Sequence, residues 1–376
     1  MITQILRWNI LRFLGVFKML IYVWCYDGSN FEKTHVIDYA ESVIWVSRYR
    51  DCGEFEIYVP ASKELVELFQ GEVLFTRNES DTTMVLEKIQ LTTDAENGDY
   101  LIVSGRSLES VLSRRVVHKQ TTLDGTLENG IRKLLNDIFI SPPKWNKDRM
   151  IPNMKIGSIN QFKEDLNKQI TGENVLDVMI DICTSFDIGF KLNNKQNINE
   201  FVFSLYSGDD VSDKVIFSPK FGNLSKTEYS FDYTVSPNFI YVAGQGEGED
   251  RALVGYEADE ASFSDLEGLS RKEYYVDQRD CQTNSSSPIH DTFYLALLHT
   301  KGREKYQELK PVVIYSGEIL DNGMYKYGED YFLGDTVLIE NDYGIKAKAT
   351  IVEITEVEDE TGYKIVPKLS EWRVIK

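Results

Sequence analysis

YKYGEDYFLGDTVLIENDYGIKAKATIVEITEVEDETGYKIVPK, residues 325–368, predicts an antiparallel β unit at the C-terminal end of the chain. It contains three runs rich in Val, Ile and Thr, which are separated by turn residues such as Asn, Asp and Gly. The runs are 336–340, 345–357 and 363–369. The middle run alternates, but apolar residues occur on both of its faces, which is typical of a strand that curves in a small barrel. We therefore expect a small β-barrel here.

A corner is expected directly before the first of these strands. Gly328 and Gly334 flank the aromatic residues Tyr331 and Phe332. Glycine adopts backbone angles that strain other residues, and aromatic side chains bury large apolar areas. The run YGEDYFLGD therefore predicts a tight turn whose aromatic residues close the end of a core.

The first third of the chain predicts a second β-rich unit. Its apolar runs have the spacing of a sandwich or barrel and lie at 20–26, 42–49, 53–59, 73–77, 84–92 and 99–105. The period becomes helical at 105–117, where Leu108, Val111 and Leu112 share a face. Ser107 is placed to cap this short helix.

The middle of the chain predicts mixed α/β structure. Runs 126–139 and 174–186 have helical periodicity, and 186–192 with 200–206 predicts a hairpin. The hairpin core is expected to contain Ile188, Phe190, Leu192, Phe201, Phe203 and Leu205. Further on, the expected elements are strands at 253–256 and 271–276 and a helix at 291–309.

Composition excludes several classes of protein. At 376 residues the chain is too long for one core, and 42% hydrophobic residues exclude a mainly disordered chain. A net charge of −19 leaves no basic footprint for duplex recognition, so sequence-specific nucleic-acid binding is not expected. The four cysteines form no CxxC motif, which argues against zinc and favours free thiols. No cofactor is indicated.

Residues 1–26 are apolar, but Arg7, Arg12 and Lys18 interrupt each apolar run before it can span a bilayer. No stable membrane anchor is therefore expected. Two alternatives remain for residues 1–18. They form either an amphipathic segment that lies on a partner or a membrane surface, or a translated leader before a natural start at Met19.

No catalytic, cofactor-binding or metal-ligating residue is assigned. Arg48, Arg50 and Asp51 resemble a charge cluster, but they lie in a strand and a turn without a second acid or a histidine nearby. Ser107 and Ser110 lack the G-x-S-x-G context of a nucleophile. The remaining candidates also lie outside catalytic or metal motifs; these are His35, His118, His290 and His299.

Acidic and glycine-rich runs have similar non-catalytic interpretations. Asp209-Asp210 and the acids of 356–360 are expected in turns and at solvated surfaces. The run GQGEGEDR, residues 244–251, has the appearance of a dinucleotide loop. It places Glu249 where the third glycine would be, and no clear helix follows, so we expect a strand exit and a glycine turn instead.

Several motifs in order resemble the tail hub family of long-tailed phages, the baseplate proteins that close the tip of the tail tube. This family includes the N-terminal hub module of tail-associated lysins. The motifs are RYRDCGEFEI at 48–57, GRSLESVLSRRVV at 105–117, GQGEGEDR at 244–251, DQRD at 277–280 and YGEDYFLGDTV at 327–337. Gln278 departs from the small residue usual in the fourth motif. The resemblance extends from about Met19 to the C-terminal end of the sequence.

This resemblance implies a mainly β fold with α+β insertions, made of two small antiparallel β-barrel domains plus smaller mixed α/β domains. The expected division is residues 1–18 as the leader or amphipathic segment, 19–117 as the first barrel, 118–218 as a small α/β domain, 219–246 with 311–376 as the split second barrel, and 247–310 as an inserted mixed domain.

The resemblance also implies a structural, non-enzymatic role in a virion tail tip, with the protein made in the bacterial host cytoplasm. A homotrimer would present six similar barrels, which matches a six-fold tube to a three-fold tip. Expected partners are the distal tail protein, the tail tube, the tape-measure protein and receptor-binding or fibre proteins. The alternative is a cell-wall-degrading enzyme, a peptidoglycan hydrolase whose carboxylate site no motif reveals.

Overall fold

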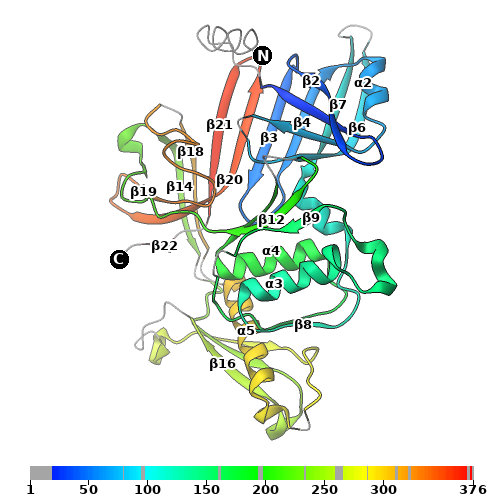
Figure 1. Ribbon diagram of the computed structural model, residues 1–376. Helices are drawn as coiled ribbons and strands as arrows, with labels where there is room; N and C mark the ends of the chain where they lie inside the picture. Colours follow the sequence, from blue (N-terminus) through cyan, green and yellow to red (C-terminus); the bar gives the residue numbers. More distant parts are fainter. Residues whose placement is uncertain are drawn as a thin grey trace.

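The computed structural model describes residues 19–78, 80–94, 98–159, 162–193, 198–232, 234–258, 266–285, 287–309, 312–320, 323–370 and 373–374. The expected leader or amphipathic segment, residues 1–18, lies outside the described residues. Strands dominate the regular structure, and helices lie mainly in the middle and lower parts of the molecule (Figure 1). The expectation of a mainly β chain with α+β insertions is therefore confirmed.

The N-terminal unit is an antiparallel sheet in the strand order β3-β4-β7-β6-β5-β1-β2. The strands are β1 (Ile21–Tyr26), β2 (Phe31–Ile37), β3 (Ser42–Arg48), β4 (Glu54–Pro60), β5 (Val73–Arg77), β6 (Met84–Asp94) and β7 (Gly98–Ser107). All except β2 coincide with runs that the sequence predicts. β2 has Glu, Lys, Thr and His in its middle, and only Ile37 is buried, so the strand has no clear apolar alternation.

An aromatic core fills one side of this sheet. The short helix α2 (Lys63–Leu68) begins where the Ser62 hydroxyl accepts a hydrogen bond from the Leu65 N–H at 3.1 Å. Leu65 and Phe69 are buried against the strands. The largest buried side chains from the strands themselves are Trp45, Phe55 and Phe75.

The C-terminal strand β20 (Lys346–Asp359) is shared between two units. Its first half pairs with β19 (Thr336–Glu340). Its second half lies between β21 (Gly362–Leu369) and β3, so that strands from both ends of the chain stand side by side (Figure 1). The three strands predicted from the C-terminal sequence are thus confirmed, and the structure adds their pairing with the N-terminal sheet.

A β-bulge after Ile351 changes the face that β20 buries. Ala347, Ala349 and Ile351 are buried before the bulge, whereas Ile354 and Glu356 are buried after it. An extra residue in one strand reverses the alternation of its side chains. The bulge therefore explains why apolar residues fall on both faces of this strand in the sequence.

The two expected barrels are not found, because strand pairing in the described residues closes neither β unit. The strand order runs open from β2 at one edge to β19 and β13 (Ile216–Phe217) at the other. The reason lies in β20, which hydrogen-bonds to the outer edge of β3. That edge is consequently not available to meet β2 and close the N-terminal sheet.

Mixed α/β structure lies between the β units. Its elements are the 3₁₀-helix η1 (Leu108–Arg114), β8 (Thr121–Leu123), α3 (Leu127–Leu135), η2 (Asn136–Ile140), η3 (Lys144–Arg149), β9 (Met154–Ile156), β10 (Lys168–Ile170), α4 (Val175–Phe186), β11 (Gly189–Asn193) and β12 (Phe201–Tyr206). The expected hairpin pairs Phe190 with Leu205 and Leu192 with Phe203, and all four side chains are buried. Phe201 is only half-buried.

The rest of the chain forms two further groups of elements. One contains β13, η4 (Pro219–Phe221), β14 (Leu224–Asp232), β18 (Val312–Ile319), β19 to β21 and β22 (Arg373–Val374). The other contains β15 (Phe239–Ala243), η5 (Gly248–Asp250), β16 (Leu253–Glu257), η7 (Gly268–Ser270), β17 (Glu273–Asp277), η8 (Pro288–His290) and α5 (Thr292–Leu309). β15 precedes residue 247, yet it pairs with β16 and β17, which follow it.

The expected glycine corner is present before β19, but only one of its two central aromatic side chains is buried. The Gly328 N–H donates to the Tyr331 carbonyl at 3.0 Å, and the Gly334 N–H donates to the Ile351 carbonyl at 2.8 Å. Tyr331 is buried against Phe217, as expected for a residue that closes a core. Phe332 is 52% exposed, so only part of the aromatic run serves this purpose.

We predict that Gly334→Val destabilises the protein by about 1–3 kcal/mol. Gly334 has φ +99°, and a Cβ there would lie 2.6 Å from Cε2 of the buried Tyr49. Gly328→Val is the matched control, because Gly328 has φ +85° but a Cβ added to it would meet no atom within 4 Å. Urea unfolding should give the larger loss for Gly334→Val. Equal midpoints for Gly334→Val and the wild type would contradict this account of the corner.

Candidate functional site

Arg77 and Glu356 form a buried ion pair where the N-terminal sheet meets β20. Their side chains are 1% and 4% exposed. The Arg77 guanidinium also lies 5.3 Å from the centre of the Trp45 ring, and Glu356 accepts a hydrogen bond from the Tyr363 hydroxyl. Because an isolated buried charge is very costly, each partner requires the other to be in place.

The expectation that the acids of 356–360 lie at a solvated surface is wrong for Glu356. The bulge in β20 turns Glu356 to the same side as the buried Ile354, whereas Glu360 is exposed in the following turn. The sequence signal that could have indicated this is the two-residue spacing between Ile354 and Glu356. The sequence does not indicate the position of the bulge, although the bulge decides which face of β20 is buried.

A polar cavity of about 450 Å³ adjoins this pair. Its wall combines residues of β3, η1, the hairpin β11–β12, the glycine corner and β20, which come from distant parts of the sequence. It contains the carboxyl groups that a hydrolase would require, namely those of Asp81, Glu109, Asp209, Asp335 and Glu356. Burial raises the pKa of the Tyr327 hydroxyl, which also lines the cavity, and the charge of Glu356 raises it further.

Several of these carboxyl groups already hold the backbone together. Asp335 accepts hydrogen bonds from the N–H groups of Asp209 and Phe332, each at 2.8 Å. Glu109 accepts one from the Leu192 N–H at 2.7 Å. Burial raises the pKa of Glu109, and the hydrogen bond from Leu192 opposes that rise. A buried acid with a raised pKa can serve as a general acid, so Glu109 is the strongest candidate for such a role here.

The charged residues of the first motif make structural contacts. Arg48 binds Glu54 and Glu353 at 2.6 Å each, so it joins β4 to β20 through β3. Arg50 pairs with Asp187 at the end of α4. The Asp51 carboxylate accepts the N–H of Cys52 at 2.6 Å.

The serine candidates are buried in the same region. Ser107 precedes η1, but its hydroxyl does not cap that helix, which corrects the expectation from the sequence. Instead it accepts the Gly53 N–H at 2.7 Å. Ser110 is also buried, and its hydroxyl has no hydrogen-bond partner in the described residues.

The four histidines lie on separate elements and have different neighbours. His35 on β2 contacts Tyr39, and His118 contacts Arg149. His290 lies in η8, and His299 on α5 packs against Tyr256. The structure therefore brings no histidine together with Ser107 or Ser110 into a described hydrogen bond.

The acidic pair Asp209-Asp210 contributes to two different contacts. Asp210 binds Lys348, and the hydrogen bonds from Lys348 and then Ser212 lower its pKa to about 2. Asp209 uses its N–H to donate to Asp335. These contacts connect the segment before β13 to β20 and to the corner.

The run GQGEGEDR forms the expected strand exit and glycine turn. Gly246 has φ +106°, and only the short η5 separates β15 from the antiparallel β16. Arg251 donates to the carbonyls of Ala243 and Gly244 and binds Asp277 at 2.6 Å. Arg251 thus links the end of the turn back to its start, and the strand β16 follows instead of an α-helix. The turn therefore offers no helix N-terminus at which a dinucleotide phosphate could bind.

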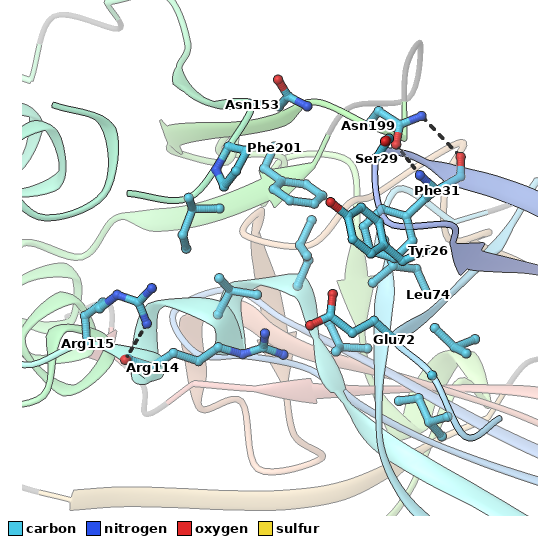
Figure 2. Close-up of a pocket in the computed structure, with 18 residues that line it drawn as sticks. Tyr26, Ser29, Phe31, Glu72, Leu74, Arg114, Arg115, Asn153, Asn199 and Phe201 are labelled. Carbon is cyan, nitrogen blue, oxygen red and sulfur yellow. Dashed lines mark hydrogen bonds between the residues drawn. The ribbon is translucent and has the colours of Figure 1, made fainter. Parts of the chain in front are cut away.

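A second cavity, of about 470 Å³, lies between the N-terminal sheet and the α/β region. Figure 2 shows the rings of Tyr26, Phe31 and Phe201 on one side of it and the side chains of Arg114 and Arg115 on the other. The Asn199 side chain joins the two regions, since its amide group exchanges hydrogen bonds with the backbone of Phe31. None of these lining residues was assigned a function from the sequence.

The described part of the chain has neither a membrane-spanning helix nor a cluster of metal-ligating side chains. No helix there is long and apolar enough to cross a membrane. No three His, Cys, Asp or Glu side chains are grouped there so as to hold a metal ion. The four cysteines are free thiols, and burial raises the pKa of Cys52 to about 12.

Comparison with known proteins identifies a family over nearly the whole chain. A model of the family described as Siphovirus ReqiPepy6 Gp37-like protein matches residues 20–369. No curated protein matches the sequence.

Solved structures of bacterial tail proteins share the fold at low sequence identity. A tail protein from Neisseria meningitidis MC58 has a TM-score of 0.55 at 14% identity, over 94% of this chain and 97% of that one. The prophage tail protein gp18 from Listeria monocytogenes EGD-e has a TM-score of 0.54 at 13% identity, over 93% and 94%. A 43 kDa tail protein of prophage MuSo2 from Shewanella oneidensis has a TM-score of 0.53 at 12% identity, over 94% and 98%.

We predict that Arg77→Met lowers the free energy of unfolding by about 3–5 kcal/mol, because it leaves the Glu356 carboxylate buried without its cation. The double variant Arg77→Met/Glu356→Gln removes both charges and should recover most of that loss. Chemical denaturation of the wild type, Arg77→Met, Glu356→Gln and the double variant measures both effects. If the double variant were as unstable as the sum of its single changes, the ion pair would not be the source of the coupling.

Proposed function

The chain belongs to the Siphovirus ReqiPepy6 Gp37-like protein family, and we propose that this phage tail protein is the baseplate hub of a tail tip. The observation that carries the proposal is the extent of the match, residues 20–369. A fold common to tail proteins over more than nine-tenths of both chains supports it. The protein's place in the virion is thus the tail, and the tip is the proposed location within it.

The proposed hub is a homotrimeric ring that closes the tail tube and takes part in host attachment and genome delivery. In this hypothesis the two β units of each chain, although not closed into barrels, occupy equivalent places and alternate around the ring. Three copies would give six similar units. The continuous strand pairing from β2 through β20 to β19 supports a rigid connection between the two units.

The proposed partners follow from this location. The tail tube, the distal tail protein and the tape-measure protein would contact the ring, and receptor-binding or fibre proteins would attach around it. A specific contact of this kind buries on the order of 1,000 Å² or more. Exposed large apolar side chains, among them Leu91, Trp145, Leu253 and Tyr275, are candidates for such contacts.

A second candidate function is cell-wall hydrolysis, which the raised pKa of Glu109 beside the polar cavity favours. A muralytic assay on the wild type, Glu109→Gln and Asp335→Asn separates the two functions. The hub proposal expects no release of glycan or peptide fragments from any of them. Cleavage by the wild type that disappears in Glu109→Gln would support the hydrolase instead.

We predict that the purified protein forms a trimer, at least when its distal tail partner is present. Light scattering coupled to size-exclusion chromatography should give three times the 43.3 kDa mass of one chain, plus the mass of the bound partner where it is present. The partner alone and each protein at matched concentration are the controls. A chain that stays monomeric with and without the partner would count against the ring.

We also predict that carboxylates outnumber basic groups on the inner surface of the ring. A wall of the same sign as the phosphate backbone disfavours binding of the genome in transit, and the chain's net charge of −19 is consistent with such a wall. The alternative is that the acidity serves solubility alone. The assembled ring should therefore fail to retain duplex DNA at physiological salt, and a lumen lined mainly by Lys and Arg would refute the hypothesis.

A further inference from the structure

A compact basic surface stands out on this acidic chain. It consists of Arg114, Arg115, His118, Lys119 and Arg149, which come from the end of η1, the segment after it and η3. Arg114, His118 and Lys119 are exposed, and Arg115 and Arg149 are half-buried. Among the described ion pairs none of the five binds a carboxylate, although the charge of the adjacent Asp148 acts on Arg149 and opposes the lowering of its pKa.

Backbone carbonyls, rather than acids, orient two of these guanidinium groups. Arg115 donates to the carbonyl of Arg149 at 3.2 Å and to that of Arg114 at 2.9 Å. Arg149 donates to the Val116 carbonyl at 2.6 Å and contacts the His118 ring. Burial lowers the pKa of Arg149, and the charge of Arg115 lowers it further. A carbonyl fixes a guanidinium without neutralising it, so the surface remains able to bind an anion.

Exposed apolar side chains lie among these cations. Trp145 in η3 is 63% exposed, and Lys119 lies 4.0 Å above the centre of its ring. Val116 and Met150 are also exposed, at 46% and 48%. Arg, Trp and Met are the residue types enriched in protein–protein interfaces. A simple inorganic anion would make no contact with these apolar side chains, so their presence favours a protein partner.

The basic surface continues into the cavity of Figure 2. Arg114 and Arg115 line that cavity, as do Ile151 and Pro152, which follow η3. The opposite wall is aromatic, with Tyr26, Phe31 and Phe201, and Figure 2 shows both sides. Glu72 is the one carboxylate in the lining, and it forms no ion pair with Arg114 among the described contacts. The cavity therefore combines apolar lining residues with a cationic side formed by Arg114 and Arg115.

We propose that this site docks an acidic peptide segment of another protein, with an apolar side chain in the cavity and carboxylates on Arg114, Arg115 and Arg149. Charge complementarity and the apolar lining together favour this occupant. A long polyanion such as DNA fits less well, because it would extend beyond the four Arg and Lys residues of this surface onto a chain of net charge −19. A short segment makes only the favourable contacts. The inference does not depend on the ring or on the trimer.

The test uses the full chain and a short fluorescein-labelled peptide that alternates Glu with Phe. Fluorescence anisotropy should detect binding that weakens with salt, and Gln-Phe and Glu-Ser peptides should each bind at least about tenfold more weakly. Arg114→Glu/Lys119→Glu should reduce affinity for the Glu-Phe peptide by about tenfold or more. Ser29→Trp, which puts a large side chain at the rim of the cavity, should weaken binding without a change of charge.

Lys133→Glu is the matched control, because Lys133 is an exposed residue on α3 that does not line the cavity. Circular dichroism and thermal melts establish that each variant is folded. Equal affinity of the wild type and Arg114→Glu/Lys119→Glu would overturn the proposal. So would the absence of binding to the Glu-Phe peptide, or tighter binding of single-stranded DNA or polyphosphate than of that peptide.

Discussion

The hydrogen bonds between β3 and the second half of β20 fix how the parts of the molecule are placed relative to one another. This edge pairs residues 43–48 with residues 353–358, so it joins segments from opposite ends of the chain. Two ion pairs accompany it, Arg48 with Glu353 and Arg77 with Glu356. Because Arg77 and Glu356 are both buried, a misplaced β20 would leave charges unpaired in the core, which is a strong energetic reason for one register.

The same edge also determines where the cavities lie. The α/β region follows directly from β7 through η1, and its hairpin returns to the strands at Tyr49, whose carbonyl accepts the Phe190 N–H at 3.2 Å. The polar cavity occurs where β3, β20 and that hairpin meet. The cavity lined by Arg114 and Arg115 lies against η1 and against β1, β2 and β5. Both therefore exist only because three regions of the chain are held against one sheet.

Charge is distributed unevenly over this framework. Many acids are paired with Arg or Lys across units, as Lys168 is with Glu304 on α5 at 2.8 Å. Other acids cap turns, as Asp27 does for Ser29 and Asn30. The basic surface around Arg149 is different, because backbone carbonyls rather than carboxylates orient its Arg115 and Arg149 side chains. A negatively charged chain with a basic surface of this kind is suited to a partner that recognises that surface through complementary charge.

Local structure and family membership follow from the amino-acid sequence. Alternation and turn residues predicted six N-terminal strands, the three C-terminal strands and the hairpin, since these depend on side-chain period and on glycine conformation. The sequence did not predict β2, because this strand lies at a sheet edge, buries few side chains and has polar residues in its middle. Long-range contacts, in contrast, decide the rest. They pair β20 with both β units, so that neither unit closes into a barrel. They also bury Glu356 after a bulge and bring Arg114 and Arg149 to one surface. Each of these features depends on contacts between residues far apart in the chain. Which strand edge β20 pairs with is decided by the tertiary structure, and the local sequence pattern of β20 does not indicate it.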